Sequence, residues 1–201
     1  MTPIPGELLA HEGCAVVEPE EIRLLAPRVP APSSMNAGGN AWCEANYGPH
    51  CKQKMVTITL FGHSIAVNAQ AVRAFRRLDH VFREHDPKFY AKVKAGQCGC
   101  YSCRPVAGTS TWSMHAWCLA VDDLWSEMPR GTDPRDSIIY REASDSLAVV
   151  QHEGWRWGGW WPSPDPMHLE LRLTPEQQKV RYHLDGTKKD GFKNLPNVST
   201  I

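Results

Sequence analysis

The sequence has no excess of charge of either sign. Lys plus Arg number 22, and Asp plus Glu also number 22, which leaves a formal net charge of zero over 201 residues. Nucleic acids and anionic membrane surfaces bind proteins largely through basic patches. The charge balance gives no support to either kind of partner, and we expect no binding to nucleic acid.

Long apolar runs, internal repeats and low-complexity segments are also missing. A membrane-spanning helix needs about 18 or more consecutive apolar residues, so no membrane insertion is expected. Residues 1–7 carry neither a basic segment nor an apolar core, and we expect no signal peptide. The apolar fraction is ordinary for a globular protein.

The chain is long enough to bury a core without covalent staples. Residues 1–40 are rich in proline and lead into Gly38-Gly39, which is typical of an arm or linker. Residues beyond 185 are polar and turn-rich. We therefore expect an N-terminal arm over 1–40, one domain over 41–185 and a C-terminal tail or linker stub over 186–201. We expect a monomer.

Seven cysteines are present, and their odd number in a chain without an export signal favours thiols. Cys98, Cys100 and Cys103 form the densest cluster. One interpretation is a structural zinc site, completed by Cys43, Cys51 or His50. The alternative is a set of small buried thiols or an incidental disulfide, because the spacing lacks two clean CxxC pairs.

Periodicity predicts a mixture of strands and amphipathic helices. The segment 167–173 alternates most clearly, with apolar odd positions for a core and His168, Glu170 and Arg172 on the other face. Asn68 is predicted to cap a helix, and 86–112 is predicted to be irregular. The expected strands are 54–61, 64–67, 119–122 and 167–173, and the expected helices are 19–25, 68–85, 137–151 and a short one from 174.

Two segments carry the residues of a catalytic metal site. His115 precedes a short buried strand that ends at Asp122, and His168 lies on the polar face of its own strand. A charge on a buried strand must be paired or metal-bound. Two imidazoles and a carboxylate are a usual ligand set for catalytic zinc, which keeps its fourth position for water. Asp165, three residues before His168, is a candidate base for that water.

Other residues near these segments are candidates for contact with a substrate. Arg104 precedes the first segment and would suit a carboxylate or an oxyanion. Tryptophan is abundant, with eight residues, and its apolar area and N–H suit either a groove wall or a core. Five tryptophans lie within or beside the two segments: Trp112, Trp117, Trp157, Trp160 and Trp161.

The two segments together resemble the signatures of the M15 family of zinc peptidases. Ser113-x-His115-x-x-Cys118-x-Ala120-x-Asp122 is similar to the family's SxHxxGxAxD. Trp157-Gly-Gly-Trp160 followed by Asp165-x-x-His168-x-Glu170 is similar to WGGxW and (D/E)xxHxE. Both halves occur in the family's order, and the resemblance spans roughly residues 55–175.

The resemblance implies a role for each matching residue. His115, Asp122 and His168 would bind zinc, and Asp165 would be the general base. Arg104 would hold a substrate carbonyl or carboxylate, Ser113 and Trp160 would line the site, and Glu170 would orient His168. The implied fold is α+β, a small antiparallel sheet flanked by helices, as in hedgehog and D,D-peptidase domains, with zinc in a cleft over the sheet.

One position departs from the family pattern. Cys118 stands where the family has glycine. Glycine suits a position with positive φ or a close backbone approach, and a thiol so near the metal could compete as a ligand.

The favoured function is a zinc-dependent peptidoglycan peptidase that cleaves the stem peptide, and within this class the phage endolysin type is favoured. Such an enzyme is made in the cytoplasm and acts on the cell wall after release. One alternative is a D,D-carboxypeptidase or dipeptidase of the same fold. Two others are a non-catalytic zinc-containing binding module and a purely structural zinc site.

Overall fold

The computed structural model describes residues 39–190. The helix predicted over 19–25, and the predicted arm up to residue 38, lie outside the described residues, as does the predicted tail from 191 onward. The predicted domain boundaries at 41 and 185 stay a prediction. Among residues 39–190, no helix is long and apolar enough to cross a membrane.

The described part of the chain combines helices with two small antiparallel sheets, which confirms the expected α+β class. Strands β1 (Met55–Leu60) and β2 (His63–Asn68) form a hairpin. A four-stranded sheet has the order β3-β4-β6-β5. Its strands are β3 (Cys98–Gly99), β4 (Ala120–Asp123), β6 (His168–Leu171) and β5 (Trp155–Trp157).

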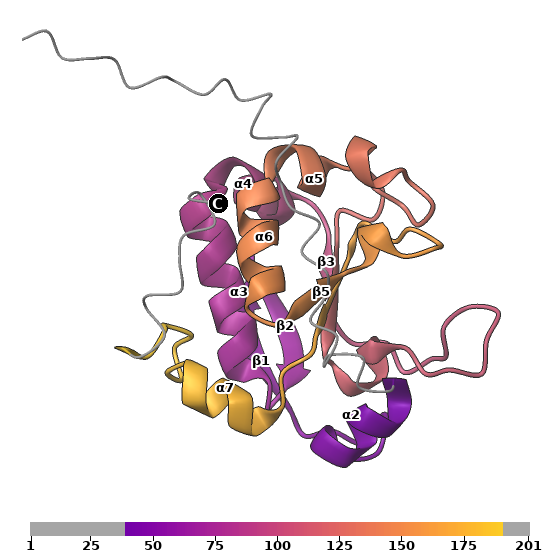
Figure 1. The fold of residues 1–201 in the computed structure, drawn as a ribbon, viewed down its shortest axis with the longest axis vertical. Coiled ribbons are helices and arrows are strands. Elements are labelled where there is room, and N and C mark those ends of the chain that lie inside the picture. The colour runs from indigo at the N-terminus through magenta and orange to yellow at the C-terminus, as the bar shows by residue number, and fades with distance from the viewer. Residues whose placement is uncertain (1–38, 191–201) are drawn as a thin grey trace, which may run out of the picture.

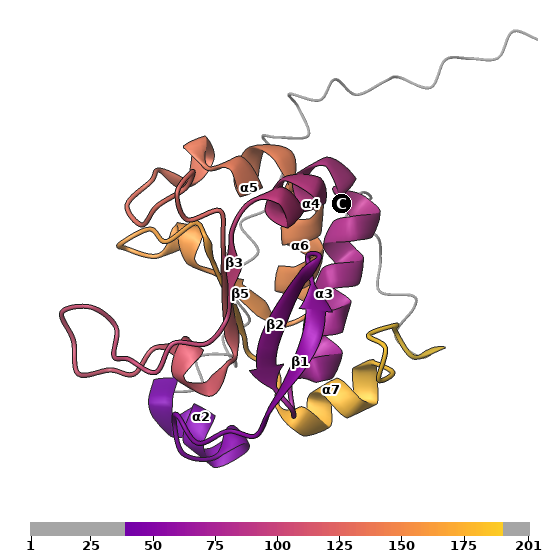
Figure 2. The ribbon, with the colours of Figure 1, turned by 180° about the vertical axis from the view of Figure 1, so that it is seen from behind.

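Most of the helices lie on one side of the four-stranded sheet (Figures 1 and 2). The longest, α3, contacts α6, α4 and β1, and α6 also contacts β5. Helix α2 contacts the turn that carries His115. The helices are α2 (Gly39–Tyr47), α3 (Val72–His85), α4 (Pro87–Ala95), α5 (Ile138–Glu142), α6 (Ser144–His152) and α7 (Pro175–Arg181).

Helix α3 supplies much of the core because its apolar residues recur at helical spacing. Phe75, Leu78 and Phe82 are fully buried. The ring of Phe75 packs edge-on against Trp155 of β5, and the ring of Phe82 packs edge-on against Phe61. This helix therefore joins the hairpin to the four-stranded sheet.

The predicted helix cap at Asn68 is wrong. Asn68 is the last residue of β2, and α3 begins at Val72. The Asn68 side chain accepts a hydrogen bond from Gln70 N and donates one to Trp117 O. Asn side chains commonly form such local turns with the backbone two residues on. The helix therefore starts about one helical turn later than predicted, at Val72.

Two further predictions need correction. The segment 86–112 is not wholly irregular, because Pro87 starts helix α4, which buries Phe89 and Val93. The predicted helix over 137–151 is two helices that meet at Ala143. The Ser137 hydroxyl caps the first, and the second begins where Ser146 N donates to Asp86 Oδ2.

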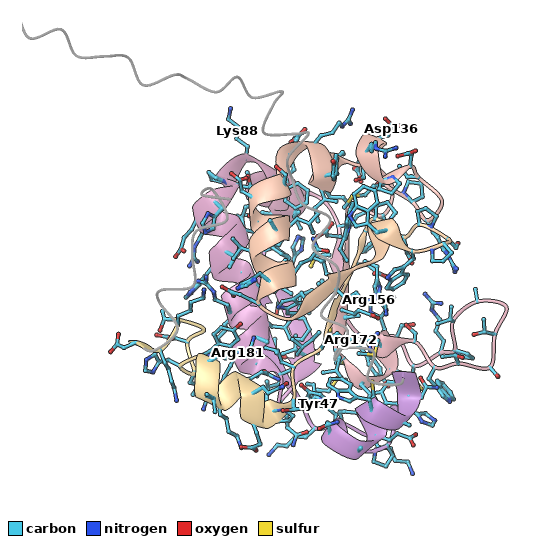
Figure 3. The ribbon with its side chains drawn as sticks, in the orientation of Figure 1. Tyr47, Lys88, Asp136, Arg156, Arg172 and Arg181 are labelled. Carbon is cyan, nitrogen blue, oxygen red and sulfur yellow. A yellow bond between two sulfur atoms is a disulfide. The ribbon has the colours of Figure 1, made fainter. Side chains whose placement is uncertain are left out.

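The C-terminal part of the described chain packs closely on the rest. Thr174 and Gln177 form a reciprocal capping box at the start of α7, which confirms the helix predicted there. The hydroxyl of Tyr47 donates to Leu173 O and accepts from Gln178 Nε2, so it joins α2 to α7 (Figure 3). Lys188 forms an ion pair with buried Glu153.

Candidate metal centre

The sheet register brings Asp122 and His168 together. Asp122 of β4 lies directly opposite His168 of β6, and side chains of directly opposed residues share one face of a sheet. His115 reaches the same point from a single 3₁₀ turn, Met114–Trp117, just before β4. One strand pair and one turn thus bring His115 and His168 next to Asp122, although they lie 7 and 46 residues away from it in the sequence.

Three ligand atoms meet within hydrogen-bonding distance of one another. His168 Nδ1 lies 2.8 Å from Asp122 Oδ1, and His115 Nε2 lies 3.1 Å from both atoms. Both histidines are buried, and Asp122 is partly exposed. Among residues 39–190, this is the one group of His, Cys, Asp or Glu residues placed to share a metal ion.

Hydrogen bonds on both sides fix the turn that carries His115. The Ser113 hydroxyl accepts from His115 N, and the His115 Nδ1–H group donates to Cys100 O. A donor at Nδ1 leaves the lone pair at Nε2, the nitrogen that faces Asp122 and His168. The turn therefore presents a single nitrogen to the candidate site.

The turn ends at Cys118, which has a φ of 51°. This left-handed conformation explains why a glycine suits the position, and a side chain there costs roughly 1–2 kcal/mol. The Cys118 thiol is fully buried and lies 2.9 Å from Met55 Sδ. It is not among the three side chains placed to share an ion.

His168 has a second partner behind it. Its Nε2 atom lies 3.3 Å from Glu170 Oε2, and Glu170 in turn accepts a hydrogen bond from Arg172. The ring of Trp161 packs against the His168 ring with centroids 5.2 Å apart. The Glu170 contact supports the orienting role expected from the sequence, which stays a prediction.

The electrostatics of the three side chains favour a positive charge among them. Burial by itself lowers the pKa of His168, but the hydrogen bonds and charges of Asp122 and Glu170 raise it to about 10. Burial raises the pKa of Asp122, and the two histidines outweigh this and hold it well below its ordinary value. The group is therefore built to hold a cation, which a metal ion or a proton can supply.

Asp165 lies beside this group with a carboxylate oxygen that has no hydrogen-bond partner. Within residues 39–190, Asp165 Oδ1 is buried and unpartnered. Burial raises the pKa of Asp165, and its charge interacts with those of His168, Asp122 and His115. A buried acceptor without a partner, next to a cation-binding group, is a suitable place for a base that takes a proton from water.

The two glycines after Trp157 explain how this loop closes. Gly158 O accepts hydrogen bonds from Asp165 N and Trp161 N. A Cβ atom at Gly158 would lie 2.5 Å from Asp165 O and 3.3 Å from the His168 Cβ atom. A Cβ atom at Gly159 would lie 2.3 Å from the Trp157 ring. Glycine is thus required for the Asp165 loop to pack against β6.

The other predicted site residues have different surroundings. Within the described chain, the exposed Arg104 guanidinium contacts Ser102 and none of the three ligand residues. Ser113 is buried and caps the His115 turn. Trp160 is 51% exposed and packs edge-on against Trp157 and Tyr140. The substrate contacts expected of all three stay predictions.

The cysteine cluster does not form a four-ligand metal site in the described chain. Cys103 forms a disulfide with Cys51, so neither sulfur is a free ligand. Cys98 and Cys100 are free thiols, and burial raises the pKa of Cys98. The preference for thiols therefore does not hold for Cys51 and Cys103, and the alternative of an incidental disulfide applies to Cys103.

Two further residues on the face of the candidate metal centre had no role predicted from the sequence. Trp125 is 42% exposed, and its ring lies 3.6 Å from the place a Cβ atom would take at Gly99, which is paired with Asp122. The preceding residue, Leu124, has a φ of 45°. Arg172 contacts Glu170, and alternation along 167–173 was the signal that placed it on this face.

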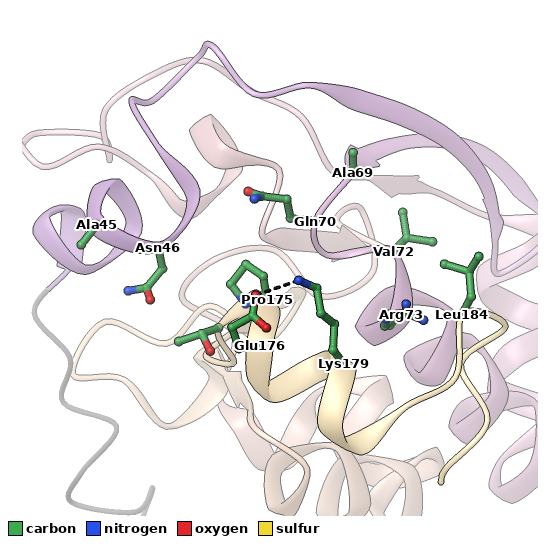
Figure 4. Close-up of a pocket in the computed structure, with 11 residues that line it drawn as sticks. Ala45, Asn46, Ala69, Gln70, Val72, Arg73, Pro175, Glu176, Lys179 and Leu184 are labelled. Atoms are coloured by element: carbon green, nitrogen blue, oxygen red, sulfur yellow. Dashed lines mark hydrogen bonds and ion pairs between the residues drawn. The ribbon is translucent and has the colours of Figure 1, made fainter.

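A separate depression lies between α2, α3 and α7 and has a volume of about 420 Å³ (Figure 4). Its walls include Gln70, Arg73 and the ion pair of Lys179 with Glu176. It shares no residue with the candidate metal centre.

Comparisons with known proteins point to one family. Residues 107–171 match the M15 family model described as D-alanyl-D-alanine carboxypeptidase. The match includes His115, Asp122, Asp165 and His168 and does not reach Arg104. No curated protein and no solved structure matches the chain. Over residues 107–171 the chain is thus similar to the M15 family of peptidases, and this segment contains the His and Asp residues that the structure brings together.

Proposed function

We propose that this protein is a zinc-dependent peptidase that hydrolyses an amide bond in the stem peptide of peptidoglycan. The observation that carries the proposal is the buried His115–Asp122–His168 group beside the unpartnered oxygen of Asp165. The proposed fold is that of the hedgehog and D,D-peptidase domains, with the metal above the β4–β6 pair.

The residues present fit zinc. Two imidazole nitrogens and one carboxylate oxygen are a ligand set of catalytic zinc sites. A tetrahedral ion with bonds of about 2.0–2.1 Å separates its ligand atoms by about 3.3–3.4 Å. The three atoms are 2.8–3.1 Å apart, so small side-chain rotations are enough. The Cys100 carbonyl and Glu170 orient the imidazoles, as outer partners commonly do in zinc sites.

The chain's own residues suit amide hydrolysis. Zinc, when bound, would supply Lewis-acid chemistry, polarising a carbonyl and making water more acidic. Asp165 Oδ1 would accept the proton of the attacking water and later return it to the leaving amine. Gly158 and the backbone of the 158–168 loop hold this carboxylate in place. Arg104 remains a candidate for contact with a substrate carboxylate or carbonyl.

Replacement of Asp165 tests the proposal. Asp165→Asn removes the proton acceptor at nearly constant volume, so turnover on purified peptidoglycan should fall by about 10²–10⁴-fold. Zinc content should stay at the wild-type level. The matched control is Asp145→Asn, an exposed acid in the first turn of α6, which should keep full activity. Wild-type turnover by Asp165→Asn would show that the proposed base is wrong.

Within this class we propose an endopeptidase of the phage endolysin type. The proposal is supported by the segment from Tyr101 to Arg104, which is similar to the segment in which the M15 family places an arginine. The second candidate is a D,D-carboxypeptidase or dipeptidase, which the description of the matched family favours. Mass spectrometry of digested peptidoglycan separates the two. New internal amino termini support the endopeptidase, and loss of a terminal alanine supports the carboxypeptidase.

A non-catalytic binding module is the alternative from another class. A pure binder has no need for a carboxylate beside the metal, so the position of Asp165 argues against it. The expected location, synthesis in the cytoplasm and action on the cell wall after release, is also a proposal. Fractionation of cells before and after lysis would test it, since the protein should pass from the soluble to the wall fraction.

A further inference from the structure

The carboxylate of Glu170 is divided between two partners. Its Oε2 atom faces His168 Nε2 at 3.3 Å, and its Oε1 atom accepts a hydrogen bond from Arg172 Nη2. Period-two alternation on and after β6 puts the three side chains on the same face. The three side chains form a continuous series of polar contacts from Arg172 through Glu170 to His168.

The side chains of His168 and Glu170 are buried, and that of Arg172 is nearly so. The exposed fractions are 7% for the His168 side chain, 5% for Glu170 and 9% for Arg172. A buried carboxylate is costly unless a charged partner and hydrogen bonds compensate it. The guanidinium of Arg172 is the cation closest to the Glu170 carboxylate. The Arg172 Nε atom has no hydrogen-bond partner among the described residues. The Glu170 contact is thus the main polar contact of the Arg172 guanidinium.

The contact between Glu170 and His168 fixes the tautomer of the imidazole. An ionised carboxylate only accepts hydrogen bonds, so Nε2 of His168 must carry the hydrogen. By the same rule, Nδ1 carries a hydrogen for Asp122 Oδ1 at 2.8 Å when no ion is bound. When zinc takes the place of that hydrogen, the lone pair lies on Nδ1, which also faces His115 Nε2 at 3.1 Å. If Glu170 rotated away, nothing described on that side of the ring would select this tautomer.

We propose that Arg172 is a positioning residue of the metal centre, which holds Glu170 against His168 Nε2 so that Nδ1 faces the ion. This inference rests on the proposed binding of zinc by His168. It assigns Arg172 no contact with substrate or metal.

A second arginine provides a matched control. Arg156 Nη1 lies 3.8 Å from the same Glu170 oxygen, but the Arg156 side chain is 44% exposed and also lies over the Trp161 ring (Figure 3). A solvent-screened cation at that distance holds a carboxylate weakly. Removal of Arg156 should therefore leave the Glu170 geometry unchanged, although it removes the same formal charge.

The experiment compares zinc affinity in the full-length protein, measured by competition with a chromophoric chelator. Arg172→Met should weaken zinc binding by about 10–100-fold, as loss of an outer partner commonly does. Arg172→Lys, which keeps the charge, should recover most of the affinity, and Arg156→Met should bind zinc within about twofold of wild type. Wild-type affinity in Arg172→Met, or an equal loss in both Met variants, would overturn the inference.

A second readout does not depend on the folding of any variant. In the zinc-loaded wild-type protein, nitrogen NMR of labelled histidine should show His168 with its hydrogen on Nε2. A hydrogen on Nδ1 would overturn the inference. If the wild-type protein binds no zinc at all, the proposed function fails. If it binds zinc and hydrolyses peptidoglycan while Arg172→Met does the same, only the role of Arg172 fails.

Discussion

Removal of the disulfide between Cys51 and Cys103 should destabilise the fold strongly. The bond joins residues 52 positions apart in the sequence. Closing a loop of that length removes enough chain entropy from the unfolded state to stabilise the native state by about 4 kcal/mol. For a chain of this size, the midpoint of thermal unfolding should fall by about 8–16 °C.

The assay is chemical denaturation of the oxidised protein, the reduced protein and the double variant Cys51→Ser/Cys103→Ser. The reduced protein and the variant should unfold at the same denaturant concentration, well below that of the oxidised protein. The variant is also the control for the reductant, because added reductant should not change its midpoint. Equal midpoints for the oxidised and reduced wild-type protein would refute the reasoning.

Reduction of the disulfide between Cys51 and Cys103 should also affect the candidate metal centre. Cys51 N donates to Ala116 O, and Ser102 N donates to His115 O, so the disulfide joins the two segments that hold the His115 turn. Reduction should therefore weaken zinc binding as well as the fold. An unchanged zinc affinity in the folded, reduced protein would show that the turn is held without the disulfide.

Three other perturbations have clear expected outcomes. Glu153 is buried and bound by Arg77 at 2.9 Å and Lys188 at 2.6 Å, so Glu153→Gln should lower the free energy of unfolding by about 3 kcal/mol at neutral pH. Burial raises the pKa of Glu153, but Arg77 and Lys188 outweigh this effect and lower the pKa. The stabilisation by the ionised carboxylate is therefore present above the ordinary pKa of about 4.5 and is lost as the pH falls through the lowered pKa. If urea titrations gave the same difference in unfolding free energy between wild type and variant at neutral and acid pH, this reasoning would be contradicted. Gly158→Ala should displace the Asp165 loop, because the new Cβ atom would meet Asp165 O at 2.5 Å. The kcat for peptidoglycan should therefore fall while the zinc content stays the same. A wild-type kcat would argue against this packing. Trp125→Ala should raise KM for peptidoglycan fragments with zinc affinity unchanged, because the exposed ring lies against Gly99, the residue paired with Asp122. An unchanged KM would place Trp125 outside the substrate site.

The parts of the fold that depend on local pattern could be predicted from the sequence. Alternation along 167–173 predicted both β6 and the shared face of His168, Glu170 and Arg172. Proline at the first position and the Thr174–Gln177 box marked the start of α7. The sequence motifs also selected the three residues that the structure brings together.

Features set by tertiary contacts could not be predicted in this way. The break at Ala143 coincides with the contact of Ser146 with Asp86, which is 60 residues away. Helix α4 is only nine residues long and has a weakly apolar face, so its pattern did not stand out. The partner of Cys103 depends on how Cys51 is folded beside the His115 turn, which no spacing of cysteines reveals.

Zinc binding by His115, Asp122 and His168 is most directly tested by metal analysis combined with an anomalous-scattering map of the zinc-soaked protein. The account predicts one zinc ion per chain in contact with His115 Nε2, Asp122 and His168 Nδ1, and loss of that ion in His168→Ala. Zinc bound elsewhere, or full zinc content in His168→Ala, would contradict it.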